Sequence, residues 1–150
     1  MDSKAEKSKI RSKLVIKKTD EKQVQFIKNL NAFLNSKKDK SVIGYTALKS
    51  EPELKGIENH IPQNANKIEN DYLGYDIYLV PCIAVDKGLN RLGRGGGFYD
   101  RLIARMRQEE PDSLFIVCCF SEQIIDSIPA EPHDQKVDGV ISDRGVLIKM

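Results

Sequence analysis

The sequence predicts an α/β fold, a three-layer αβα sandwich with helices on both faces of a mostly parallel or mixed central sheet. Two stretches carry this prediction, YDIYLVPCIAV at residues 75–85 and SLFIVCCF at residues 113–120. Both are nearly continuous apolar runs, which is typical of strands covered on both faces. An amphipathic helical pattern lies between them, and strands that alternate with helices favour a parallel sheet. The length of 150 residues, with 40% hydrophobic and 31% charged residues, predicts a single domain over residues 1–150.

Two basic helices are expected near the N-terminus, together covering about residues 4–37. Residues 4–17 predict a strongly basic first helix. Residues 20–36 repeat apolar side chains at helical spacing, and Asp20 is the expected N-cap. The apolar face of this second helix is predicted to consist of Val24, Ile27, Leu30, Phe33 and Leu34.

The remaining elements follow from breaks in the apolar pattern. Pro52, Pro62 and several Asn and Gly residues predict mostly loop over residues 49–75. Pro81 interrupts the strand expected over residues 75–85. The helix that follows the glycine-rich stretch has an apolar face of Phe98, Tyr99, Leu102, Ile103 and Met106. Short strands are expected at residues 41–48, 136–143 and 145–150.

The charge is unevenly distributed along the chain. Twelve of the 24 basic residues lie among the first 40 positions, beside five acidic residues, although the formal net charge is only +2. Such a region favours a phosphate-bearing partner or, equally, a solvated helix face. Because no aromatic residue is interleaved with the lysines of the basic N-terminal helix at residues 4–17, we expect no nucleic-acid binding. No apolar run approaches the length of a membrane span, so no membrane association is expected.

The three cysteines predict a reducing compartment. Cys82, Cys118 and Cys119 are odd in number and lack the spacing of a disulfide framework or a metal site. Since Cys118 and Cys119 lie inside an apolar strand, we interpret them as small core side chains. The expected location is cytoplasmic.

The glycine-rich stretch RLGRGGGFYDR, at residues 91–101, predicts a phosphate site. It follows a strand and opens a helix, and the free backbone N–H groups of a helix N-terminus favour an anion. Glycines let the backbone approach a ligand closely, and Arg91 and Arg94 add charged donors. The spacing fits neither GxxxxGK[ST] nor GxGxxG. A flexible turn is the structural alternative, but a turn requires fewer glycines.

Two acidic positions are candidates for binding Mg²⁺ beside a bound polyphosphate. Asp100 falls in the first turn of the helix after the glycines, where an acid is also favourable on purely structural grounds. The segment IPAEPHDQKVDGV contains Glu131, His133, Asp134 and Asp138. A local turn, with Asp134 accepting backbone hydrogen bonds, is the alternative for that segment.

Two longer segments together resemble the 5-formyltetrahydrofolate cyclo-ligase family. These are VPCIAVDKGLNRLGRGGGFYDRLI and IPAEPHDQKVDGVIS, which agree with the family in residue types, order and spacing over most of residues 76–142. KSKIR at residues 7–11 and SVIGYTALKSEPE at residues 41–53 are similar to the family's basic helix motif and to its first strand and acidic turn. The resemblance implies an ATP- and Mg²⁺-dependent closure of 5-formyltetrahydrofolate to 5,10-methenyltetrahydrofolate, with release of ADP and phosphate.

The resemblance also implies roles for individual residues. Arg91 and Arg94 would be catalytic, and Asp100 and Asp134 would hold Mg²⁺. Glu51, Arg94 and Phe98 would contact the folate. The nucleotide loop is expected at residues 91–100, and ATP would be bound by Lys7, Arg11, Arg91, Gly93, Arg94, Gly95, Gly96, Gly97, Phe98 and Tyr99.

The chain departs from the family pattern at two places. Phe98 stands where the family usually has Tyr, so any role of that hydroxyl is lost. Several tens of residues that usually follow the acidic turn are missing, and Gly56, Ile57 and Glu58 come almost directly after it. The gap predicts that the ATP half of the site is intact and that the folate half is altered. The expected oligomeric state is a monomer or homodimer. The alternative is a shortened relative that binds a nucleotide or a partner without folate turnover.

Overall fold

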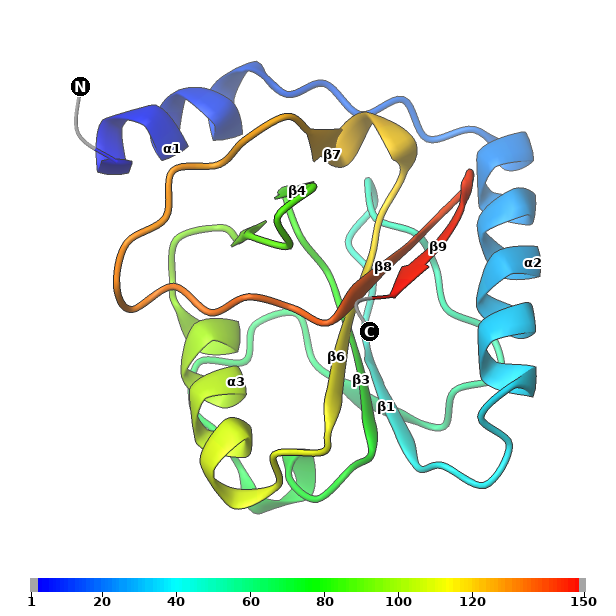
Figure 1. The fold of residues 1–150 in the computed structure, drawn as a ribbon. Helices are drawn as coiled ribbons and strands as arrows, with labels where there is room; N and C mark the ends of the chain where they lie inside the picture. Colours follow the sequence, from blue (N-terminus) through cyan, green and yellow to red (C-terminus); the bar gives the residue numbers. More distant parts are fainter. Residues whose placement is uncertain (1–2, 149–150) are drawn as a thin grey trace.

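The computed structural model describes residues 3–148. Figure 1 shows its helices and strands in sequence colours. The helices are α1 (Ser3–Lys13), α2 (Asp20–Asn35) and α3 (Phe98–Glu109), with 3-10 turns η1 (Asn70–Tyr72) and η2 (Ser121–Gln123). The strands are β1 (Val42–Tyr45), β2 (Asn59–Ile61), β3 (Ile77–Val80), β4 (Ala84–Asp86), β5 (Arg91–Leu92), β6 (Leu114–Cys118), β7 (Ile124–Ile125), β8 (Gly139–Ser142) and β9 (Gly145–Ile148).

A six-stranded sheet forms the centre of the molecule, in the order β2-β1-β3-β6-β8-β9. Its first five strands are parallel, and β9 pairs antiparallel with β8 at one edge. The chain leaves β1 toward β2 on one side and then returns to place β3 on the other side of β1. The order of the strands therefore reverses beside β1 and β3, where open α/β sheets bind ligands at the carboxyl ends of the strands.

Helices cover the two faces of this sheet, as the sequence predicts (Figure 1). Residues Phe26, Leu30 and Phe33 of α2 pack on one face against side chains that include Tyr45 and Ile116. Leu102, Ile103 and Met106 of α3 pack on the opposite face with Tyr78, Phe115 and Val117. Each fully buried Leu or Phe contributes roughly 1.5–3 kcal/mol from burial. The three-layer αβα arrangement with a mostly parallel sheet is confirmed.

A smaller sheet of order β5-β4-β7 lies beside the carboxyl ends of the main sheet. Its buried Ala84 and Leu92 join Ile128 in a separate apolar cluster. Helix α1 rests on this cluster through Ile10 and Leu14. Because this contact fixes one face of α1, its neighbouring basic face is directed toward the carboxyl ends of the parallel strands.

The N-terminal helices differ from the prediction at their ends. Helix α1 ends at Lys13 rather than at residue 17, and residues 14–19 have no regular structure. The N-cap of α2 is Thr19, not Asp20: its hydroxyl accepts a hydrogen bond from the backbone N–H of Lys22 at 3.2 Å. An extended backbone at Thr19 separates the two helices, because an N-cap residue adopts non-helical angles.

One other prediction is wrong in part. Val24 is half exposed, whereas Phe26 is fully buried, so the apolar face of α2 is rotated toward Phe26. Residues 49–75 are mostly loop, as expected, although they also contain the short elements β2 and η1. Strand β2 has only three residues and pairs on one side, with β1. A three-residue edge strand contains too few apolar positions for a strand pattern to be recognised in the sequence.

Other predictions are confirmed. The strand expected over residues 75–85 is broken at Pro81 into β3 and β4. All three cysteines are free and buried. Within residues 3–148, no helix is both long enough and apolar enough to cross a membrane. Of the strand expected at residues 145–150, β9 covers Gly145–Ile148, and residues 149–150 lie outside the described range.

Candidate active site

A cavity of about 510 Å³ opens at the carboxyl ends of β1, β2 and β3. Its wall combines side chains from α1, from the segments that follow these three strands, from the glycine loop (residues 93–97) and from residues 131–134. The parallel sheet explains this convergence, since the carboxyl ends of its strands meet at one edge.

The cavity brings together every residue that the sequence predicts for the site. These residues come from four separate stretches of the chain. They are Lys7, Arg11, Glu51, Arg91, Gly93, Arg94, Gly95, Gly96, Gly97, Phe98, Tyr99, Asp100 and Asp134.

The glycine loop needs glycine at specific positions. Gly95 and Gly97 have φ of 110° and 72°, in the region that side chains with a Cβ rarely adopt. A Cβ on Gly93 would lie 3.0 Å from Nη1 of Arg91, so glycine there leaves room for the guanidinium. Gly97 is the N-cap of α3 and provides no side-chain cap. The first amides of α3 therefore have no capping side chain at the cavity wall, as an anion site requires.

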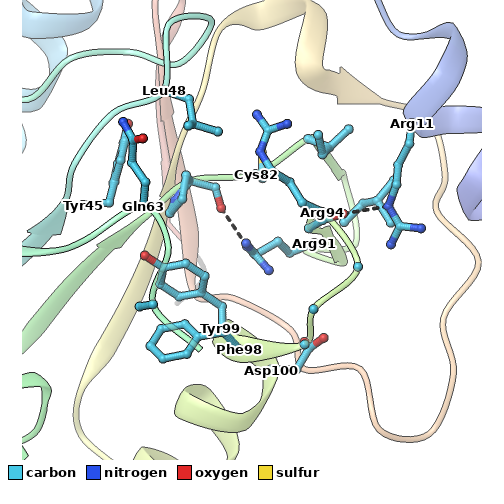
Figure 2. Close-up of a pocket in the computed structure, with 18 of the residues that line it drawn as sticks. Arg11, Tyr45, Leu48, Gln63, Cys82, Arg91, Arg94, Phe98, Tyr99 and Asp100 are labelled. Carbon is cyan, nitrogen blue, oxygen red and sulfur yellow. Dashed lines mark hydrogen bonds between the residues drawn. The ribbon is translucent and has the colours of Figure 1, made fainter. Parts of the chain in front are cut away.

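Two arginines at the glycine-loop end of the cavity are held by backbone carbonyls (Figure 2). Arg91 donates from Nε to the carbonyl oxygen of Pro81 at 2.7 Å, and its guanidinium lies 4.9 Å from the centre of the Tyr99 ring. Arg11 donates from Nε to the carbonyl oxygen of Gly93 at 2.8 Å. Each guanidinium is held through Nε, which leaves its terminal nitrogens for other acceptors.

Helix α1 presents three basic side chains to the cavity: Lys4, Lys7 and Arg11. They are spaced i, i+3 and i+7, which places them on one helical face. The sequence prediction did not include Lys4, although this spacing from Lys7 is a signal that could have identified it.

Lys7 is buried and paired with the acidic loop. Its ammonium contacts the carboxylate of Asp134 and lies 3.4 Å from Oε1 of Glu131. Burial alone would raise the pKa of Asp134, but hydrogen bonds from Lys7 and from the backbone N–H of Glu131, with the charges of Lys7 and His133, lower it overall. Asp134 is therefore ionised at neutral pH. It also accepts the local backbone hydrogen bond of the turn alternative, from the N–H of Glu131 at 2.9 Å.

Asp100 connects α3 to the same loop. Its Oδ1 accepts a hydrogen bond from the backbone N–H of Gln135 at 3.1 Å. Asp100 and Asp134 thus line one cavity beside the glycine loop. Two carboxylates fit Mg²⁺, which completes its shell with water and nucleotide phosphates. Asp138 lies elsewhere: it pairs with Arg107 at 3.0 Å and accepts from the backbone N–H of Phe115.

Glu51 is buried on the other side of the cavity. Its Oε1 accepts from the backbone N–H of Leu48 at 2.7 Å, and its Oε2 lies 3.7 Å from Nη2 of Arg94. The carboxylate is held by its own turn and faces the glycine loop. Two of the three predicted folate contacts, Glu51 and Arg94, are therefore neighbours.

The rest of the cavity is apolar and aromatic. Figure 2 shows Tyr45, Leu48 and Gln63 on the side away from Arg11. The wall here also includes Ile61, Pro62, Ala65, Cys82, Phe98 and Tyr99. Burial raises the pKa of Tyr99 although the charge of Arg91 opposes this, so its phenol remains protonated at neutral pH. The Phe98 ring packs in the core, edge-on to Tyr72 and Tyr99.

Sequence reasoning missed the lining residues at or just after the carboxyl ends of the strands, such as Tyr45, Gln63 and Cys82. Gln63 follows β2, a strand that was not predicted. Tyr45 and Cys82 lie in or after predicted strands, and their position at carboxyl ends was the available signal.

Comparisons with known proteins agree on one family. The model of the 5-formyltetrahydrofolate cyclo-ligase family matches residues 33–143. A 5-formyltetrahydrofolate cyclo-ligase from Mus musculus is 41% identical over 69 residues, which cover 45% of this chain and 34% of the relative. One from Mycolicibacterium smegmatis is 40% identical over 73 residues, covering 48% of this chain and 36% of the relative. These alignments therefore span little more than a third of either relative.

Solved structures match over nearly the whole chain. The 5,10-methenyltetrahydrofolate synthetase from Mycoplasma pneumoniae has a TM-score of 0.71 and 24% identity, over 95% of this chain and 99% of that chain. The synthetase from Aquifex aeolicus has a TM-score of 0.70 and 23% identity, over 99% of this chain and 93% of that chain. The fold as a whole is shared, in spite of the gap predicted after the acidic turn. Because the family model matches well over half of the chain, this protein belongs to the 5-formyltetrahydrofolate cyclo-ligase family.

Proposed function

We propose that this protein uses ATP and Mg²⁺ to cyclise 5-formyltetrahydrofolate to 5,10-methenyltetrahydrofolate, releasing ADP and phosphate. One observation carries the proposal. All the residues expected to serve the reaction line a single cavity, which has a basic, glycine-rich end and an apolar, aromatic end. A triphosphate fits the first end by charge, and a flat heteroaromatic ring fits the second.

The reaction requires a poor leaving group to be activated. The formyl oxygen takes the γ-phosphoryl group of ATP, and ADP leaves. Nitrogen N10 of the folate then attacks the formyl carbon, and the phosphorylated oxygen leaves as phosphate. Catalysis of this kind is mainly positioning and neutralisation of charge around the transferred group.

The residues of the basic end fit those two tasks. The free amides at the start of α3 and the terminal nitrogens of Arg91 would bind phosphate oxygens. Arg11 would hold the glycine loop through Gly93 while its remaining donors face the nucleotide. Lys7 would exchange its contact with Asp134 for the triphosphate. When bound between Asp100, Asp134 and the phosphates, Mg²⁺ would neutralise charge on the transferred group.

Glu51 and Arg94 would meet the folate where the two ends of the cavity join. Arg94 would neutralise the activated formyl oxygen. The Glu51 carboxylate, already held by Leu48, would accept a hydrogen bond from the folate without reorganising. Phe98 would contribute through packing alone, since it lacks the hydroxyl of the Tyr usual in the family.

The test is direct. Purified protein is mixed with 5-formyltetrahydrofolate, ATP and Mg²⁺, and the methenyl product is followed by its absorbance, with a reaction without ATP as control. We expect ATP-dependent product. We expect Asp100→Asn to fold normally and to lose at least about tenfold in Mg²⁺-dependent turnover, because one metal carboxylate becomes neutral. An Asp100→Asn variant that folds and turns over like wild type would remove Asp100 from the metal site.

A shortened relative without folate turnover is the competing function, motivated by the gap after Glu51. This competing function predicts that calorimetry detects ATP binding while the assay detects no methenyl product.

We also propose that the protein is cytoplasmic, is a monomer or homodimer and does not bind nucleic acid. Steeply salt-dependent RNA or DNA binding would contradict the last point.

A further inference from the structure

Arg101 connects two walls of the cavity that are far apart in the sequence. Its guanidinium donates from Nη1 to the carbonyl oxygen of Gly96 at 2.8 Å. The same group donates from Nη2 to the carbonyl oxygen of Asn66 at 3.2 Å. Gly96 belongs to the glycine loop at the basic end of the cavity. Asn66 adjoins Ala65, which lines the cavity with Pro62 and Gln63 after β2.

The glycine loop lies directly against this side chain. A Cβ on Gly97 would lie 3.1 Å from Nη1 of Arg101, so the guanidinium packs close to this glycine. Arg101 is also in the first turns of α3, where a positive charge is unfavourable to the helix dipole. The hydrogen bonds to the carbonyl oxygens of Gly96 and Asn66 compensate for this unfavourable position of the charge.

We propose that Arg101 is a positioning residue that couples the two ends of the cavity, by holding the glycine loop and residues 62–66 at a fixed separation. This inference rests on the proposed function, in which the nucleotide binds at one end and the folate at the other. Arg101 itself contacts neither reacting group. Because the guanidinium fork has two donors that point to two segments, ordering of one segment by its ligand favours ordering of the other.

The proposal predicts a distinct kinetic result for Arg101→Ala. The KM values for ATP and for 5-formyltetrahydrofolate both rise by roughly tenfold, while kcat changes less, because the chemical groups remain in place. Arg101→Lys recovers only part of the loss, since one ammonium cannot reproduce the planar two-donor fork.

Arg105→Ala is the matched control. Arg105 lies one turn further along α3, is exposed and pairs with Glu109 at 2.8 Å. The Arg105→Ala substitution removes the same charge from the same helix and leaves both walls of the cavity unchanged. We expect its KM values to stay within about twofold of wild type.

Hydrogen exchange provides a readout that does not depend on turnover. In ligand-free protein, Arg101→Ala should speed amide exchange in residues 93–97 and also in residues 62–66, whereas Arg105→Ala should change neither. If wild type gives no methenyl product, the proposed function fails and this exchange measurement still decides the role of Arg101. The proposal is overturned if Arg101→Ala speeds exchange in one segment or none, or if wild type is active and the variant raises the KM of only one substrate.

Discussion

Arg91 serves both the fold and the candidate site. Its Nε is committed to the carbonyl of Pro81, at the point where Pro81 breaks the β3–β4 strand. Its guanidinium plane is held at the Tyr99 ring and beside Gly93. Only the terminal nitrogens are left for a ligand, and their direction is set by these three contacts. A side chain fixed in this way loses little entropy when it binds a phosphate.

Replacement of Arg91 should therefore damage nucleotide use more than stability. For Arg91→Ala we expect the apparent KM for ATP to rise at least about tenfold, because a charged, bidentate donor is lost. Steady-state kinetics at varied ATP measure this, and thermal unfolding checks that the fold persists. An unchanged KM for ATP would move Arg91 out of the phosphate site.

At the scale of elements, α1 and α2 have different tasks although they are adjacent in sequence. Helix α1 places Lys4, Lys7 and Arg11 at the cavity. Helix α2 packs on a face of the sheet, and among the described residues none from α2 lines the cavity. Residues 14–19, which have no regular structure, separate the two helices and end in the Thr19 cap.

This division predicts a change that affects stability alone. Thr19→Ala removes the hydroxyl that accepts from the Lys22 backbone N–H and should reduce the free energy of unfolding by about 1 kcal/mol. The KM values for both substrates should not change. Urea unfolding and steady-state kinetics test the two halves of this statement. Unaltered stability would mean that Thr19 does not cap α2, and altered KM values would mean that α2 influences the cavity.

At the scale of the whole molecule, stability depends on links between parallel strands that are distant in sequence. Asp76, just before β3, accepts hydrogen bonds from the backbone N–H and hydroxyl of Ser41, just before β1. The hydrogen bond from the Ser41 backbone is the main cause that lowers the pKa of Asp76 from its ordinary value of 3.8. The ionised carboxylate is thus favoured by the folded state.

The sign of the pH dependence follows from this shift. A carboxylate whose pKa is lowered by folding stabilises the protein above its ordinary pKa, and the contribution is lost as the pH falls through the folded value. We expect Asp76→Asn to be less stable than wild type at pH 6, with the difference shrinking as the pH falls below about 3.8. Urea unfolding of both proteins across this range measures it. A difference that does not depend on pH would show that the charge of Asp76 is not involved.

Much of the fold and of the candidate site can be predicted from local signals. The apolar runs of β3 and β6, the amphipathic pattern of α3 and the glycines of residues 93–97 each act over short stretches of chain. The family pattern added Lys7, Arg11 and Glu51, whose types alone do not distinguish them from the other charged residues. Their assembly around one cavity agrees with that pattern.

Local patterns in the sequence were enough to predict the α/β class, the break at Pro81 and the residue types that line the site, because hydrophobic periodicity and backbone freedom are local properties. The partners of these residues depend instead on the folded arrangement of the chain. Lys7 meets Asp134 across 127 positions, and Arg101 joins Gly96 to Asn66. The three-residue strand β2 forms only because β1 is there to pair with it. Such contacts depend on where the sheet brings distant segments together, which no stretch of sequence encodes on its own.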